Sequence, residues 1–199
     1  MTRSDARRSR ASILDAAVVL LNEEPDPSVE AIATAAGVTR QTVYAHFPSR
    51  EALLAAVLDR VTDEAMAELD AVDLDAGTAT EALLRLLDTS ARITARHRLL
   101  FQRANAVPVT PREDDERHQP VTARLIKVIV RGQRAGEFDD QLPPDWLATL
   151  TIRMGHAAAE EADAGRMSPA AADAALRTSL LRLLAAGPRP CFVGRGAIG

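Results

Sequence analysis

Residues 28–47, SVEAIATAAGVTRQTVYAHF, predict two short helices joined by a sharp turn. Ser28 can start the first helix, because its hydroxyl can accept a hydrogen bond from a free backbone N–H of the first turn. Gly37 follows where a left-handed backbone is needed, and glycine adopts that conformation without strain. Thr39 is placed to start the second helix in the same way. The pattern of short helix, glycine turn and second helix predicts a helix-turn-helix.

The second helix carries no acidic residue, whereas a helix that needs only solubility is usually filled with Glu and Lys. Phosphate repulsion would require such an acid-free face. Arg40 and Gln41 can form paired hydrogen bonds with guanine and adenine edges, and Thr42 can contact a base edge or a thymine methyl group. We therefore interpret this segment as a DNA-recognition helix. The alternative is a pair of helices that matters only for packing.

Residues 10–58 resemble the DNA-binding domain of the tetracycline-repressor (TetR) family of bacterial transcription regulators. The resemblance rests on segments in the family's order and spacing: RASILDAA (10–17), SVEAIA (28–33), AGVT (36–39), TVYAHF (42–47) and SREALL (49–54). The rest of the chain carries no motif. The resemblance implies an N-terminal helix-turn-helix domain, followed by a helical domain that binds a small effector and forms a homodimer.

The composition favours helices, since aromatic residues make up 3% of the 199-residue chain and Gly and Pro number 10 and 11. The net charge is −4, so any DNA contact must come from a local basic surface. An N-terminal group of arginines, opposed by Asp5, supplies one: Arg3, Arg7, Arg8 and Arg10. By themselves these arginines would indicate only a solvated chain end, but beside a helix-turn-helix they are expected to follow phosphates.

Neither a bilayer-spanning apolar stretch nor a signal peptide is recognisable, which predicts a cytoplasmic protein. The single cysteine, Cys191, excludes an intrachain disulfide. It lies near the C-terminus, where a redox role is conceivable but a lone thiol is usually incidental.

Hydrophobic periodicity and capping residues predict an all-α fold of about nine helices. After a first helix over 4–22 and the helix-turn-helix, helices are expected from 49, from 78, over 97–107, over 120–135, from 143 and over 168–187, with a further helix start at 110–113. The predicted domains are a DNA-binding domain over 1–48 and an effector-binding and dimerisation domain over 49–187, followed by a disordered tail over 188–199.

The pattern and the resemblance together predict the residues that contact DNA. Base edges are assigned to Arg40, Gln41 and Thr42, and contacts with the DNA backbone to Ser28, Thr39, Tyr44, His46, Arg50, Arg3 and Arg7. Arg50 occupies the position at which the family typically has a lysine touching phosphate, and the substitution keeps the charge.

The last two long helices are predicted to form a homodimer. Their apolar surface is larger than one partner could easily cover, and Gly155 with Ala157, Ala158, Ala159 and Ala162 permits close helix approach. The alternative is burial within one subunit. The resemblance favours the dimer, because the family pairs its last two helices across a two-fold axis. A dimer would read two half-sites about 34–36 Å apart.

An effector pocket is implied by the resemblance, and polar groups on otherwise apolar helices could orient the effector. The candidates are His97, Phe101, Arg103, Asn105, Trp146, Arg153 and His156. Each has a structural alternative: His156 could pair with Glu160, Arg153 could form a surface salt bridge, and Trp146 could be core.

An enzyme is not predicted, and neither is a cofactor or a resident metal. The four histidines lie far apart in sequence, and no nucleophile elbow or phosphate-binding glycine loop is present. Asp114, Asp115 and His118 are better explained as an exposed helix start than as a metal site. A second alternative is a helical interaction module that no longer binds DNA, which acids in the recognition helix would have indicated. The sequence does not identify the effector or the operator, nor does it separate repressor from activator.

Overall fold

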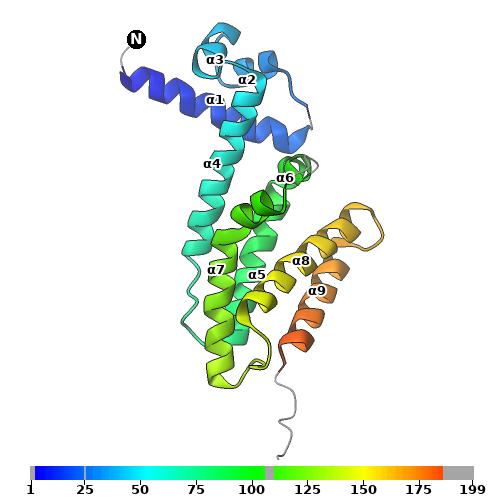
Figure 1. Cartoon of the computed structure of the whole chain (residues 1–199). Coiled ribbons are helices and arrows are strands. Elements are labelled where there is room, and N and C mark those ends of the chain that lie inside the picture. The colour runs from blue at the N-terminus through cyan, green and yellow to red at the C-terminus, as the bar shows by residue number, and fades with distance from the viewer. Residues whose placement is uncertain (1–2, 25, 106–109, 186–199) are drawn as a thin grey trace, which may run out of the picture. The chain divides into compact units, whose positions relative to one another are not determined.

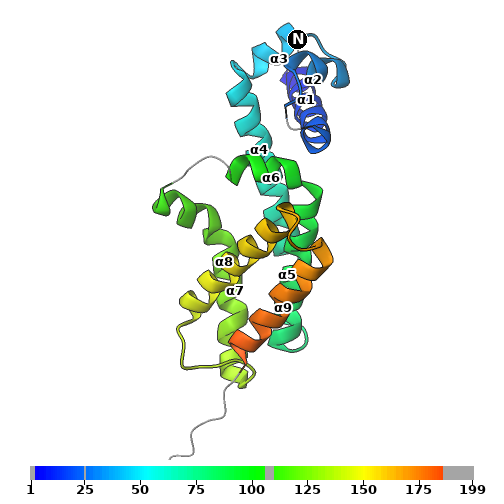
Figure 2. The same cartoon turned by 90° about the vertical axis from the view of Figure 1, so that its right-hand side faces the viewer.

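The computed structural model describes residues 3–24, 26–105 and 110–185, and within these ranges the chain forms helices and no strands, which confirms the all-α prediction (Figures 1 and 2). The helices are α1 (Arg3–Glu23), α2 (Val29–Ala35), α3 (Arg40–His46), α4 (Arg50–Asp70), α5 (Ala79–Arg96), α6 (Arg98–Asn105), α7 (Pro111–Ala135), α8 (Pro144–Asp163) and α9 (Pro169–Leu184). None of the described helices is long and apolar enough to cross a bilayer. The predicted C-terminal tail and Cys191 lie outside the described residues.

The chain packs as two compact units, Met1–Val72 with Leu87–Asp114, and Asp73–Leu86 with Asp115–Gly199. Helices α5 and α7 each contribute to both units. This division by packing places α4 and α6 with the helix-turn-helix. It therefore differs from the functional division at residue 48, which remains a prediction.

The core of the first unit joins the apolar faces of α1 to α4. Its buried residues are Ile13, Leu14, Ala17, Leu21, Val29, Ile32, Ala33, Val43, Phe47, Leu53, Val57, Val61 and, from α6, Leu100. Burial of each large side chain contributes about 1.5–3 kcal/mol. This cluster fixes α3 against α1 and α2.

Capping residues mark the starts and ends of helices where the sequence predicts them. The Ser49 hydroxyl accepts a hydrogen bond from the Ala52 N–H at 3.1 Å. Thr78 and Glu81 form the predicted capping box, in which the Thr78 N–H donates to Glu81 Oε2 at 2.9 Å and the Glu81 N–H donates to Thr78 Oγ1 at 3.1 Å. Gly136 ends α7 with a φ of +73°.

Helix α7 corrects one prediction. It runs without interruption from Pro111 to Ala135, whereas the sequence predicted a helix start near 110–113 and a separate helix from Pro120. Proline lacks the N–H of one helical hydrogen bond. Side chains of the following turn bond to nearby carbonyls: Thr122 donates to the His118 carbonyl at 2.9 Å and Arg124 to the Pro120 carbonyl at 2.6 Å. These bonds do not replace the missing Pro120 N–H, so the helix continues through the proline with the loss of one backbone hydrogen bond.

In the second unit α8 and α9 lie side by side (Figures 1 and 2). Leu147, Ala148, Leu180 and Leu184 are buried along them, as is Phe138 in the turn after α7. Trp146, by contrast, is 52% exposed, so its core alternative is wrong within the single chain.

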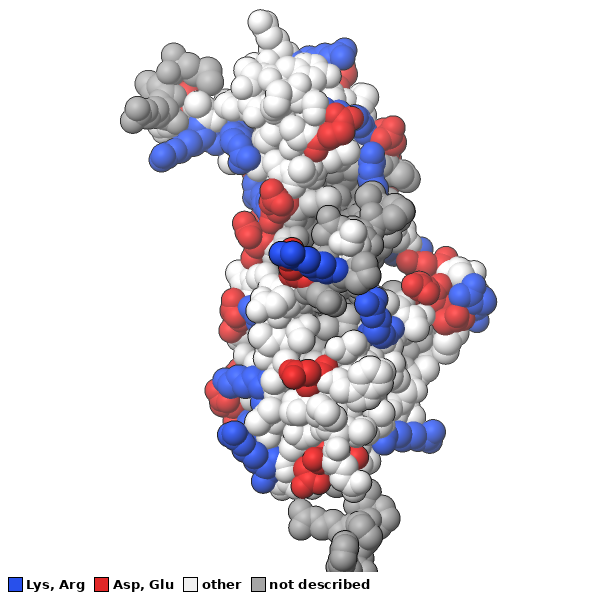
Figure 3. All heavy atoms as spheres, in the orientation of Figure 1, with Lys and Arg blue, Asp and Glu red and all other residues white. Residues whose placement is uncertain are grey.

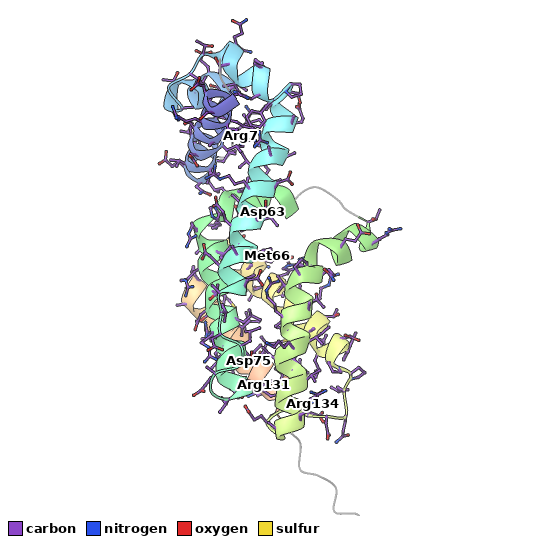
Figure 4. All side chains as sticks on the ribbon, turned by 90° about the vertical axis from the view of Figure 1, so that its left-hand side faces the viewer. Arg7, Asp63, Met66, Asp75, Arg131 and Arg134 are labelled. Carbon is purple, nitrogen blue, oxygen red and sulfur yellow. The ribbon has the colours of Figure 1, made fainter. Side chains whose placement is uncertain are left out.

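Polar contacts tie the start of α5 to α7 and the turn after it. The Glu137 carboxylate accepts hydrogen bonds from the backbone N–H groups of Ala79 at 3.0 Å and Thr80 at 3.1 Å, and these bonds hold the pKa of Glu137 below its usual value. Arg131 donates to the Asp75 carbonyl at 2.6 Å; both residues are labelled in Figure 4. The α5 N-terminus is thereby held by residues far along the chain.

Gly132→Ala should lower the free energy of unfolding by about 1–3 kcal/mol. A Cβ at residue 132 would lie 2.2 Å from Cδ2 of the buried Phe138 ring, so the ring must move. Chemical denaturation measures the change. Arg134→Ala, at an exposed position on the same helix (Figure 4), is the control and should change stability by less than about 0.5 kcal/mol. Equal stability of wild type and Gly132→Ala would contradict the close packing.

Candidate nucleic-acid interface

The helix-turn-helix is built by local hydrogen bonds at both helix starts. The Ser28 hydroxyl accepts from the Ala31 N–H at 3.0 Å and caps α2. The Thr39 hydroxyl accepts from the Thr42 N–H at 3.1 Å and caps α3, and it lies 2.9 Å from the Thr42 hydroxyl. Gly37, with a φ of +67°, makes the turn between them. The predicted helix-turn-helix is thus formed as its capping residues indicated.

Recognition helix α3 has one buried and one open side. Val43 and Phe47 are 1% and 3% exposed, whereas Arg40, Gln41 and Tyr44 are exposed. The apolar side fixes the helix to the core, and the polar side faces outward. The arrangement leaves the predicted base-reading side chains accessible to a partner.

Arg40 is held on this open side by an aromatic residue. Its guanidinium carbon lies 5.5 Å from the centroid of the Tyr44 ring, and Nη2 donates to the Tyr44 hydroxyl at 3.5 Å. Because the ring carries no charge, this contact orients Arg40 without neutralising it.

Basic residues of α1 extend the same surface. Arg7, Arg8 and Arg10 are exposed, and basic side chains gather near the N-terminal end of α1 in Figure 3. The Arg10 guanidinium carbon lies 5.0 Å from the centroid of the Phe47 ring, which links α1 to the end of α3. The sequence did not predict this contact. Arg3 belongs to α1, but its side chain lies outside the described residues.

Two residues that are predicted to contact the DNA backbone, Arg50 and His46, have side-chain atoms that are bound or buried within the protein itself. Arg50 forms a salt bridge with Asp26 at 2.5 Å and donates to the Pro27 carbonyl at 2.7 Å. Nε2 of His46 is buried without a hydrogen-bond partner among the described residues. Both residues lie at the ends of α3 and α4, as predicted, and their contact with DNA remains a prediction.

A groove of about 440 Å³ lies between α1 and α4. Arg7 and Arg10 line it from α1, and Asp59, Arg60 and Asp63 from α4; Figure 4 labels Arg7 and Asp63. Because both acidic and basic side chains line the groove, it does not form an anion-binding site.

The candidate effector contacts in the first unit lie on or beside α6. His97 is 5% exposed and its Nδ1 lies 3.3 Å from the amide nitrogen of Asn22 in α1, while Phe101 meets the His97 ring edge-on. Arg103 forms a 3.3 Å salt bridge with Asp26. Asn105 ends α6, but its side chain lies outside the described residues.

The remaining candidates belong to the second unit, on α8. Trp146 and Arg153 are exposed. The His156 ring lies beside His118 of α7, with 4.9 Å between ring centroids, a pairing that the sequence did not predict. In the described part of the chain no three His, Cys, Asp or Glu side chains are grouped as a metal site would require.

The helix-turn-helix matches a known family. The family described as "Bacterial regulatory proteins, tetR family" matches residues 13–57. The HTH-type transcriptional repressor LfrR of Mycolicibacterium smegmatis is 38% identical over 82 residues, which make up 41% of this chain and 43% of LfrR. The HTH-type transcriptional regulator EthR of Mycobacterium tuberculosis is 46% identical over 56 residues, 27% of this chain and 26% of EthR. The chain therefore aligns with less than half of the length of these curated relatives.

Solved structures share the fold over most of the chain. The TetR-like regulator LfrR from Mycobacterium smegmatis, in complex with proflavine, matches with a TM-score of 0.61 at 26% identity and covers 91% of this chain and 99% of that one. A TetR-family regulator from Pectobacterium atrosepticum matches with a TM-score of 0.71 at 22% identity and covers 95% of this chain and 100% of that one. The fold is therefore that of a TetR-like regulator with an N-terminal helix-turn-helix.

The stability of the protein should fall as the pH drops below about 6.5, in part because of His97. Burial, and next the charge of Arg96, lower the pKa of His97, while Glu64 and Glu68 oppose the shift. The amide nitrogen of Asn22 faces His97 Nδ1, an arrangement in which Nδ1 accepts and the imidazole is neutral. Stability from this neutral histidine is complete above the unfolded-state pKa of about 6.5 and is lost as pH falls towards the lower folded-state pKa, by at most about 1.4 kcal/mol per pH unit.

The measurement is the free energy of unfolding of wild type and His97→Gln between pH 7.5 and 5, where glutamine keeps a neutral acceptor. The variant profile should be flatter below pH 6.5. Parallel profiles would show that His97 does not carry this pH dependence.

Proposed function

We propose that this chain, which belongs to the TetR family of bacterial regulatory proteins, is a ligand-responsive, DNA-binding transcriptional regulator, most simply a homodimeric repressor released by a small-molecule effector. The observation that carries the proposal is recognition helix α3. It is capped, packed through Val43 and Phe47, free of acids and open on the side of Arg40 and Gln41. A DNA-bound regulator of this kind acts in the cytoplasm.

DNA recognition is divided between base and backbone contacts. Arg40, Gln41 and Thr42 would read base edges in the major groove. The backbone contacts would come from Ser28, Thr39, Tyr44, His46 and Arg50, with added affinity from Arg3 and Arg7. The exposed N-terminal part of α1 supports the last of these assignments.

A homodimer through α8 and α9 would place two recognition helices on one operator. The exposed face of α9 carries small residues, among them Ala171, Ala174 and Ala175, where a solvent-facing helix would normally carry charges. Small residues permit close helix approach. The resulting two-fold symmetry suits a pseudo-palindrome with half-sites about 34–36 Å apart.

The effector would bind in the helical domain over 49–187, in contact with some of the candidates on α6 and α8. The repressor LfrR, whose structure contains proflavine, supports ligand response as the general mode. Effector binding would favour a dimer geometry in which the recognition helices no longer match the operator, a shift between two populated states.

The first test is binding of purified protein to DNA upstream of its own gene, at several salt concentrations, against a scrambled duplex. Specific binding with a steep salt slope supports the proposal. If both duplexes bind equally weakly, a genome-wide selection of bound fragments locates the operator. An empty selection would overturn the proposal and favour an interaction module that no longer binds DNA.

Arg40→Glu should lower operator affinity by about 100-fold or more, because it removes a base contact and places a carboxylate against phosphates. Binding to labelled operator measures the loss, and light scattering should show an unchanged oligomeric state. Arg134→Glu makes the same charge change at an exposed site in the second unit and should retain most of the affinity. Similar losses in the two variants would indicate net charge rather than base reading.

Ala174→Arg should convert the dimer to a monomer, because a long charged side chain would enter the small-residue face of α9. Size-exclusion chromatography with light scattering measures the mass. The control, Ala135→Arg at the exposed end of α7, should remain dimeric. A dimer that tolerates Ala174→Arg would place the interface elsewhere.

A further inference from the structure

Two arginines from different helices share one oxygen of Asp26, which lies in the loop between α1 and α2. Oδ1 accepts a hydrogen bond from Arg50 Nη2 at 2.5 Å and lies 3.3 Å from Arg103 Nη1. Arg50 is the first residue of α4, and Arg103 lies near the end of α6. All three belong to the first compact unit. One carboxylate therefore connects the start of α4 with α6.

The shared oxygen makes the two arginines interdependent. A cation that leaves the carboxylate removes part of the charge that balances it, so the remaining arginine is attracted more strongly. The charge of Arg50, followed by the hydrogen bond from Arg103, lowers the pKa of Asp26, so the carboxylate is charged at neutral pH. Asp26 is 75% exposed, so each pair is weak enough to exchange.

This arrangement competes with the role proposed for Arg50. A guanidinium bound to Asp26 is partly neutralised, and the Asp26 carboxylate would also repel a phosphate that approaches Arg50. The side chain of Arg50 must loosen its pair with Asp26 to contact DNA fully. Its hydrogen bond to the Pro27 carbonyl, at 2.7 Å, uses another nitrogen and can persist.

We propose that Asp26 is a positioning residue that controls how freely Arg50 contacts the DNA backbone, and that Arg103 of α6 controls Asp26. The inference rests on the proposed DNA-binding function. With Arg103 also on Asp26, the carboxylate holds Arg50 less tightly, so Arg50 moves more readily to a phosphate. When a change in the effector-binding state withdraws Arg103, Asp26 holds Arg50 more tightly and operator affinity falls.

The coupling is reciprocal, as thermodynamic linkage requires. When a DNA phosphate binds Arg50, the Asp26 carboxylate is left to pair with Arg103 alone. Operator binding therefore strengthens the ion pair between Asp26 and Arg103 of α6. Arg103 belongs to α6, the last helix before α7 in the chain. Asp26 thus links Arg103, in the predicted helical domain, to Arg50, a proposed DNA contact.

Helix α6 also packs on α1 through the buried Leu100, and His97, directly before α6, contacts Asn22 of α1; neither contact involves Asp26. Replacement of Arg103 therefore should not release α6. This makes Arg103→Gln a suitable variant, since it removes the charge and leaves the helix attached.

The experiment measures operator affinity and its salt slope for Arg103→Gln, alone and combined with Asp26→Asn or Arg50→Gln. Arg96→Gln is the matched control, because Arg96 is 51% exposed, belongs to the same unit and pairs with Glu68 rather than Asp26. Arg103→Gln should bind about two- to fivefold more weakly than Arg96→Gln. Combined with Asp26→Asn, Arg103→Gln should no longer weaken operator binding. Asp26→Asn alone should bind the operator at least as tightly as wild type.

Arg50→Gln should also abolish the effect of Arg103→Gln and reduce the salt slope by about one, which a purely structural contact would not do. Equal affinities of Arg103→Gln and Arg96→Gln, or a loss that persists with Asp26→Asn, would overturn the inference while leaving DNA binding established. Failure of the wild type to bind any operator would overturn the proposed function and this inference together. Thermal unfolding of each variant confirms that it is folded, and an arginine variant that unfolds is replaced by methionine at the same position, which also removes the charge but keeps an apolar stem.

Discussion

The first unit depends on burial of the inner side of recognition helix α3. A seven-residue helix is too short to hold its conformation alone in water, so its shape must come from packing. Val43 and Phe47 supply that packing, against a core built from the apolar sides of α1, α2 and α4. The Thr39 cap then sets where the helix starts. The exposed side of α3 can carry Arg, Gln and Tyr because its side chains are not part of the core.

The arginines around this helix are held in two different ways. Arg10 and Arg40 lie over the rings of Phe47 and Tyr44, which orient a cation but leave its charge uncompensated. Arg50, in contrast, is paired with the Asp26 carboxylate, which reduces the positive electrostatic potential around its guanidinium. The positive potential that DNA would meet therefore depends on the partner of each arginine as much as on the number of arginines.

The sequence predicted what local signals determine. Caps such as Thr39, the turn at Gly37 and the spacing of apolar residues specify helix ends and buried sides within a few residues of chain, and the structure confirms them. The helix through Pro120 was missed, because the proline was interpreted as a helix start, whereas a long helix can lose one backbone hydrogen bond and continue. The ion pair of Asp26 and Arg103 joins residues 77 positions apart and carries no local signal. For the same reason the sequence could nominate pocket residues but could not show that they fall in two compact units.

Helices α5 and α7 each pass through both units. The start of α5 is held by Glu137 of the second unit, and its end by the pairing of Arg96 with Glu68 in the first. If either unit melted, the other would retain only half of an 18-residue helix, below the length at which helices are stable alone. The shared helices thus impose thermodynamic cooperativity. Substitutions in the second unit can therefore lower the stability of the helix-turn-helix, even at positions outside the first unit.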